Sequence, residues 1–200
     1  MSQMSKKVNP ITIRSKKWIV NALGELMKEK PYADITIKEI SERSGLVRQT
    51  VYRNFHTKED ILKHYIDDFY KEFINLIFKK EAITLYELLV TYFYFWIEKE
   101  EFVRNLVQNN VFSMILESHL KYLYSMGKDY RFENLIFYEG GETTDYVYHF
   151  SAGGLWYILK KWIEDNMKKS PEEMADIVLN FYHIKRLNLQ KIRREKNKRV

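Results

Sequence analysis

The chain of 200 residues contains no cysteine. This excludes thiolate catalysis, cysteine-ligated zinc, iron–sulfur clusters and a disulfide scaffold. Proline and glycine are also scarce, with three and seven residues. The 139 residues between Pro31 and Pro171 hold no proline at all, which favours long helices. No segment alternates polar and apolar side chains around an Asn-Gly or Asp-Gly turn, so we expect no sheet.

Long apolar runs are missing as well. The longest nearly apolar stretch, residues 88–97, is far shorter than the roughly 20 residues that span a bilayer. The first ten residues contain lysines but no apolar segment, so they do not resemble a signal peptide. Apolar residues make up 46% of the chain and charged residues 30%, as in ordinary globular proteins of one or two domains. We expect a cytoplasmic protein with no membrane partner.

The net charge of +6 is unevenly distributed. Residues 1–57 hold 11 basic and 5 acidic side chains, residues 58–184 hold 14 and 21, and residues 185–200 hold 8 and 1. A basic head indicates a phosphate-bearing partner, although a solvated surface without a partner would also explain it. The basic tail could likewise hold nucleic acid without specificity or be a solvated end.

Apolar residues recur at helical spacing along most of the chain. The expected helices cover residues 12–28, 36–44, 47–55, 58–80 and 84–98, then one or two within 101–126, then 143–166 and a last one from Ser170, with 127–141 as a loop. Thr36 and Glu39, like Ser170 and Glu173, have the spacing of a capping box. The expected fold is all-α with about nine helices. Residues 1–57 form a three-helix head, joined without a linker to a helical body in residues 58–200.

Residues 36–55 indicate a helix–turn–helix, with Gly45 at the turn. Four apolar residues are spaced to lock the two helices together: Ile40, Leu46, Val51 and Phe55. The outward face of the second helix is then left to Arg48, Gln49, Thr50, Tyr52, Arg53 and Asn54. These residue types read base edges or bind phosphate oxygens. No acidic residue lies between Arg43 and Lys58, whereas an ordinary surface helix mixes both signs.

Residues 35–62 resemble the DNA-binding head of the tetracycline-repressor (TetR/AcrR) family. The matching features are Thr36 at the helix start, the Gly45 turn, the Thr50-x-Tyr52-x-x-Phe55 motif and Lys58. The resemblance extends over about residues 12–62. Further on, Gly153-Gly154-Leu155-Trp156, Trp162 and Ser170-Pro-Glu-Glu-Met174 resemble the last two helices of one subset of the family.

The resemblance implies an all-helical, nucleoid-associated homodimer that usually represses transcription and leaves its operator when a small molecule enters the body. It places Thr36, Tyr52 and Lys58 on phosphates, and Arg48, Gln49 and Thr50 on bases. Arg53 and Asn54 match variable positions that sometimes contact DNA. From its place beside this face, His56 could reach a phosphate. Val47 departs from the small polar residue of many members: it cannot cap, so the helix start is capped differently or meets a thymine methyl group.

Two further sets of residues are candidates in the body. An unidentified small molecule could be held by aromatic and histidine side chains that otherwise fill the core, namely Tyr92, Trp96, His119, Tyr122 and His149. An apolar dimer seam, assigned on the resemblance, would comprise Trp156, Leu159, Trp162, Ile163, Ile177, Phe181 and Ile184. Gly153 and Gly154 inside a helix would be explained by close helix approach or by a kink.

The sequence therefore predicts a regulator of transcription that binds double-stranded DNA. The alternative is a co-regulator of the same fold whose body binds a protein in place of a small molecule. No catalytic triad, phosphate-binding glycine loop or metal motif is recognisable, so we expect no enzyme activity, no cofactor and no metal.

Overall fold

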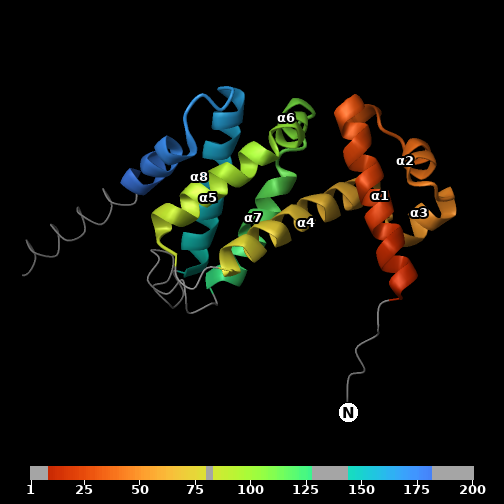
Figure 1. The fold of residues 1–200 in the computed structure, drawn as a ribbon, viewed down its shortest axis with the longest axis horizontal. Coiled ribbons are helices and arrows are strands. Elements are labelled where there is room, and N and C mark those ends of the chain that lie inside the picture. The colour runs from red at the N-terminus through yellow and green to blue at the C-terminus, as the bar shows by residue number, and fades with distance from the viewer. Residues whose placement is uncertain (1–8, 80–82, 128–143, 182–200) are drawn as a thin grey trace, which may run out of the picture. The chain divides into compact units, whose positions relative to one another are not determined.

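The computed structural model describes residues 9–79, 83–127 and 144–181. All regular secondary structure in these ranges is helical, which confirms the expected fold class. The elements are α1 (Pro10–Glu29), the 3-10 turn η1 (Tyr32–Asp34), α2 (Ile37–Ser44), α3 (Arg48–Asn54), α4 (Lys58–Phe78), α5 (Leu85–Glu98), α6 (Glu100–Gln108), α7 (Met114–Gly127), α8 (Thr144–Glu164) and a final helix over residues 171–181 (Figure 1). Among these described helices, none combines the length and the apolar character of a membrane span.

Local side-chain signals set where several helices begin. Thr36 and Glu39 form a complete capping box at the start of α2, and Thr84 and Glu87 form another at the start of α5. Ser170 accepts a hydrogen bond from the Glu173 amide at the start of the final helix. Each box satisfies backbone N–H groups that the first turn of a helix leaves without partners.

The chain divides into two compact units. The first comprises Met1–Lys71 and Glu101–Ser118, and the second comprises Glu72–Glu100 and His119–Val200. The sequence places the domain boundary at residue 57. The first unit nevertheless extends past that point, because most of α4 and the segment Glu101–Ser118 pack with the head.

In the first unit, α1 packs against α2 and α3 around an apolar core. Ile19, Leu23, Ile40, Val51 and Ile66 are fully buried there. Trp18 of α1 is apolar but lies outside this core, since 46% of this residue is exposed. Successive helix positions are about 100° apart, and the buried stripe follows Ile19 and Leu23, which turns Trp18 toward solvent.

Segment Glu101–Ser118 joins the first unit through specific contacts. The side-chain amide of Asn105 donates to the Met27 carbonyl oxygen at 2.5 Å, in the last turn of α1. The Phe102 ring lies 4.9 Å from that of Tyr65 and 4.8 Å from that of Phe69, both on α4. The head is therefore supported by residues from a distant part of the chain.

The second unit is built around aromatic residues of α5. Phe93 and Trp96 are fully buried, and the Phe93 ring makes an edge contact with Trp162 of α8 at 5.2 Å. The Trp162 indole donates to the Lys169 carbonyl oxygen at 3.0 Å, which fixes the turn before the final helix. Most of the expected loop over 127–141 and the basic tail from 185 lie outside the described residues; Gly127 itself ends α7.

Candidate nucleic-acid interface

The turn between α2 and α3 is held by one serine. The Leu46 amide donates to the Ser41 carbonyl oxygen at 3.1 Å, and the Ser41 hydroxyl donates to the Leu46 carbonyl oxygen at 2.9 Å. Gly45 between them has a φ of 68°, the left-handed conformation that glycine tolerates best. Val51 and Ile40 are fully buried, so α3 is fixed to α2 along its inner side. The sequence pattern alone did not indicate the role of Ser41.

The outer side of α3 presents the polar residues that the sequence places there. Arg48, Gln49, Tyr52 and Arg53 are exposed. Thr50 and Asn54 are half-buried, and the side-chain amide of Asn54 donates to the Thr50 carbonyl oxygen at 2.8 Å. The exposed four therefore form the accessible face of α3.

Val47 begins α3 without a side-chain hydrogen bond, and 67% of it is exposed. The amides of Thr50 and Val51 instead donate to its carbonyl oxygen at 2.8 and 3.3 Å. The start of α3 thus carries an exposed branched apolar side chain beside Arg48 and Gln49, with no carboxylate on the helix to repel a phosphate.

Thr36 is exposed but already engaged. Its hydroxyl donates to the Glu39 carboxylate at 2.8 Å and accepts from the Glu39 amide at 3.3 Å. The Lys30 ammonium, 2.5 Å from that carboxylate, and the Thr36 amide hold the pKa of Glu39 low, at about 2. A phosphate approaching α2 at this point would meet a carboxylate that stays ionised.

Lys58 differs more sharply from the expected phosphate contact. Its ammonium donates to the carbonyl oxygens of Tyr32, Ala33 and Ile35 at 2.7, 3.2 and 2.9 Å. An ammonium has three N–H donors, so this set uses all of them. Burial lowers the pKa of Lys58. In this structure Lys58 binds the connection between α1 and α2, and a phosphate contact would require it to leave these carbonyls.

The remaining expected contact, His56, is exposed just after α3. Its backbone amide and that of Thr57 donate to the Asp60 carboxylate at 3.1 and 3.0 Å, and the Thr57 hydroxyl accepts from the Asp60 amide at 3.0 Å. These hydrogen bonds cap the start of α4 and do not involve the His56 imidazole.

Charge pairing separates α3 from the rest of the helix–turn–helix. Arg43 binds both oxygens of Glu29 at 2.9 and 2.8 Å, and Lys38 lies 3.9 Å from the Glu42 carboxylate. Arg48 and Arg53, by contrast, form no ion pair with any residue in the described ranges. Their charge is therefore available to an external anion.

Three of the five residues proposed for a ligand pocket meet in the second unit. The Tyr92 hydroxyl and His119 Nε2 are 2.5 Å apart, and both residues are buried, as is Trp96 beside Tyr92. Burial lowers the pKa of His119 to about 3 and raises that of Tyr92. Of the other two, Tyr122 is half-buried, and the exposed His149 binds the Asp145 carbonyl oxygen of its own helix at 2.8 Å.

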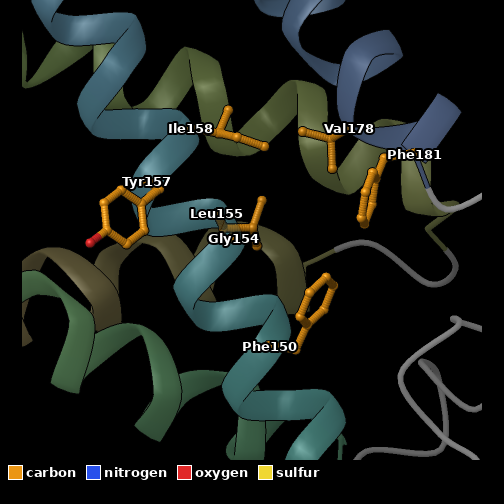
Figure 2. Close-up of a pocket in the computed structure, with 7 residues that line it drawn as sticks. All are labelled: Phe150, Gly154, Leu155, Tyr157, Ile158, Val178 and Phe181. Carbon is orange, nitrogen blue, oxygen red and sulfur yellow. The ribbon is translucent and has the colours of Figure 1, made fainter.

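The structure describes a cavity of about 280 Å³ elsewhere in the same unit, between α8 and the final helix. Figure 2 shows its lining side chains: Phe150, Gly154, Leu155, Tyr157, Ile158, Val178 and Phe181. None of the five proposed pocket residues is among them. The Phe150 and Phe181 rings are stacked 5.9 Å apart.

Three residues of the expected dimer seam are buried within the single chain. Leu159, Trp162 and Ile163 are at most 3% exposed in the single chain, so their side chains already belong to its core. Ile177 and Phe181 are exposed, Trp156 is half-buried, and Ile184 lies outside the described residues. The outer face of α8 instead carries other large side chains: Tyr146, Phe150 and Tyr157 are 78%, 55% and 67% exposed.

Helices throughout the described ranges, with a cationic helix held by a helix–turn–helix, are typical of DNA-binding transcriptional regulators. The family model described as "Bacterial regulatory proteins, tetR family" matches residues 19–65, and the one described as "Transcriptional regulator C-terminal region" matches residues 83–183. The chain belongs to the TetR family of transcriptional regulators.

Two solved structures share the fold. One, described as "Dihydroxyacetone kinase operon activator DhaS", is 18% identical, with a TM-score of 0.53 over 86% of this chain and 96% of that one. The other, the fatty acid degradation regulator FadR from Bacillus halodurans, is 17% identical, with a TM-score of 0.53 over 81% of this chain and 94% of that one. The search of curated proteins found no match.

Proposed function

We propose that the protein is a homodimeric repressor that binds a near-palindromic operator and leaves it when a small molecule binds the body. The observation that carries this proposal is the accessible face of α3. It presents Arg48, Gln49, Tyr52 and Arg53 to solvent with no acidic residue on the helix.

Within this proposal, the residues of α3 divide into two groups. Arg48, Gln49 and Thr50 lie in its first turn and read base edges, since arginine pairs with guanine and glutamine with adenine. Val47 packs on a thymine methyl group. Phosphates are bound by Tyr52 and Arg53, with Thr36, Asn54 and His56 at the edges of the contact. Lys58 supports this arrangement from inside the head.

The dimer forms, in this proposal, through α8 and the final helix. Tyr146, Phe150, Gly154 and Tyr157 are spaced to lie along one face of α8, with Ile177 and Phe181 beside them. Among the residues that the structure describes, a Cβ added at Gly153 or Gly154 would meet nothing within 4 Å. Packing within one chain therefore gives no reason for this glycine pair, whereas close approach by a second α8 does.

Release requires a ligand that binds the free and DNA-bound conformations with different affinities. We assign the transmission to α4, because residues up to Lys71 belong to the unit that carries α3 and the rest of the helix belongs to the other unit. Movement of α4 would change the spacing of the two heads. On DNA these must match half-sites about 34–36 Å apart or a multiple of that distance.

A second candidate is control by a protein partner. The observation that favours it is the packing of the proposed pocket residues: Tyr92, Trp96 and His119 are each at most 5% exposed, and the Tyr92 ring contacts the other two rings in the core. A regulator of this kind would bind its partner on an exposed surface of the body.

The test begins with selection of duplexes from a random DNA library by the purified chain. Enrichment of a two-fold symmetric sequence, with a mass of two chains by light scattering, supports the proposal. Failure to enrich any sequence would contradict sequence-specific binding. Native mass spectrometry of protein from its own host then distinguishes a bound small molecule from a stoichiometric protein. A reporter gene decides between repression and activation, since one structural neighbour is described as an activator.

A further inference from the structure

The positive charge of the head is not concentrated on the helix–turn–helix. Residues 1–24 contain five lysine and arginine residues and no acidic residue, whereas residues 25–43 contain four basic and five acidic residues. Residues 44–57 add two arginines. Most of the excess charge of residues 1–57 therefore precedes the motif that the proposed function uses.

Within the described part of this segment, the charges lie on the N-terminal half of α1. Arg14 and Lys17 are exposed there and Lys16 is half-buried. Arg14 and Lys17 form no ion pair with any described residue. Further along the same helix the pattern changes, because Lys28 lies 3.6 Å from the Glu101 carboxylate.

The same part of α1 lies beside the end of α3. The two helices are in contact (Figure 1). The Lys16 ammonium is 5.5 Å from the centre of the Phe55 ring, and Phe55 directly follows α3. Ile13 and Lys17, four residues apart, share the flank of α1 next to Lys16, and Ile13 is 57% exposed. The acid-free N-terminal half of α1 therefore lies next to the end of α3, which also carries no acidic residue.

We propose that the N-terminal half of α1 is a second DNA contact, which binds the phosphodiester backbone flanking the half-site read by α3. Arg14 and Lys17 supply the charge, and Ile13 lies against the sugar–phosphate backbone between them. This inference rests on the proposed function, because α3 must first place the head on the duplex. The contact adds affinity without sequence information, since phosphates are the same at every base pair.

The experiment compares binding to two versions of the duplex selected by the wild-type protein. One extends well beyond both half-sites, and the other ends at their outer edges. The double variant Arg14→Ala with Lys17→Ala should bind the long duplex more weakly, with a salt dependence of log K that is less steep by about 1–2. The ratio of wild-type to variant affinities should accordingly fall about tenfold between about 50 and 200 mM salt.

Three controls give the result its meaning. On the trimmed duplex, wild type and double variant should bind alike. The charge-conserving pair Arg14→Lys with Lys17→Arg should keep the wild-type salt slope, because a phosphate contact depends on charge. Lys28→Ala, on the same helix but paired with Glu101, should leave the slope unchanged. Circular dichroism confirms that each variant is folded.

The proposal is overturned if the double variant keeps the wild-type slope on the long duplex, or loses as much affinity on the trimmed one. It is also overturned if the charge-conserving pair behaves like the alanine pair. In each case specific binding by wild type would leave the proposed function standing. A wild-type protein that selects no sequence would overturn the proposed function itself.

Discussion

The ammonium nitrogen of Lys58 lies 2.7 Å from the carbonyl oxygen of Tyr32 and 4.3 Å from the centre of the same residue's ring. The Tyr32 hydroxyl in turn donates to the Glu59 carboxylate at 3.2 Å. The first two residues of α4 thus bind Tyr32 of η1 at two points: Lys58 binds its carbonyl oxygen and Glu59 its hydroxyl group. This pairing couples the start of α4 to the connection that leads into α2.

Replacing Lys58 by methionine should destabilise the protein by about 1–3 kcal/mol, because half-buried carbonyl oxygens lose their charged donor. The measurement is urea unfolding, with Lys38→Ala as the control: Lys38 is an exposed lysine on α2 whose removal should change stability by less than about 0.5 kcal/mol. Under conditions where the variant stays folded, the salt slope of DNA binding should match wild type. Unchanged stability with a slope flattened by about 1 would instead identify Lys58 as a phosphate contact.

Arg48→Ala and Gln49→Ala should each weaken operator binding by about 1–3 kcal/mol and relax the preference at one base pair. The reason is that a bidentate contact to a base edge discriminates among base pairs, whereas a phosphate contact does not. Repeating the library selection with each variant measures the preference directly. Arg53→Ala is the matched comparison and should weaken selected and random duplexes alike. Equal losses on both for Arg48→Ala would contradict base reading.

Gly154→Arg should convert the proposed dimer to a monomer, since it places a charged side chain in the middle of the exposed apolar face of α8. The chain should still fold, because no atom of the described ranges lies within 4 Å of a Cβ at this position. Gly154→Ala is the graded comparison: its single methyl group should weaken the proposed dimer less than arginine does, while each folded chain should gain up to about 1 kcal/mol from helix propensity. Light scattering reports the mass. A Gly154→Arg protein that remains dimeric would place the interface elsewhere.

His119 should make stability depend on pH in mildly acidic solution. Burial lowers the pKa of His119 to about 3, so the unfolded chain, with an imidazole pKa near 6.5, binds a proton that the folded chain does not. Stability from this residue is complete above about pH 6.5 and is lost as the pH falls toward 3, by up to about 1.4 kcal/mol per pH unit.

Urea unfolding at pH 7, 5 and 4 measures how the free energy of unfolding depends on pH. His119→Gln should remove the part due to the imidazole, so the difference between wild type and variant narrows as the pH falls. Tyr92→Phe keeps the buried imidazole and should retain the slope even if it lowers stability throughout. Parallel curves for wild type and His119→Gln would contradict the assignment.

The features that were predictable from sequence are those set by neighbours along the chain. Thr36 and Glu39 are three residues apart, and their capping box forms wherever a helix begins between them. The division of α3 into buried Val51 and exposed Arg48 likewise follows from helical period. These patterns defined the all-α fold and the accessible face of α3 before any tertiary contact was known.

Other features depend on contacts that no local pattern contains. Trp162 and Tyr157 are both aromatic residues of α8, yet one is buried by α5 and the other is exposed. The position of α5 distinguishes them, and no local pattern indicates that Trp162 is buried within the single chain. Lys58 similarly matched a family position by residue type, while its partners come from η1 and the residue after it, far earlier in the chain.

The hydrogen bond from the Asn105 side chain to the Met27 carbonyl oxygen determines how this protein can be truncated. A fragment ending at Lys71 would keep the whole helix–turn–helix. It would lose Asn105, which binds α1 at Met27, and the Phe102 ring that contacts Tyr65 and Phe69. Grafting the DNA specificity of this chain onto another regulator therefore calls for a two-piece exchange. Residues 101–118 have to be transferred together with the N-terminal segment, whereas α5, which lies between them in the sequence, is not transferred.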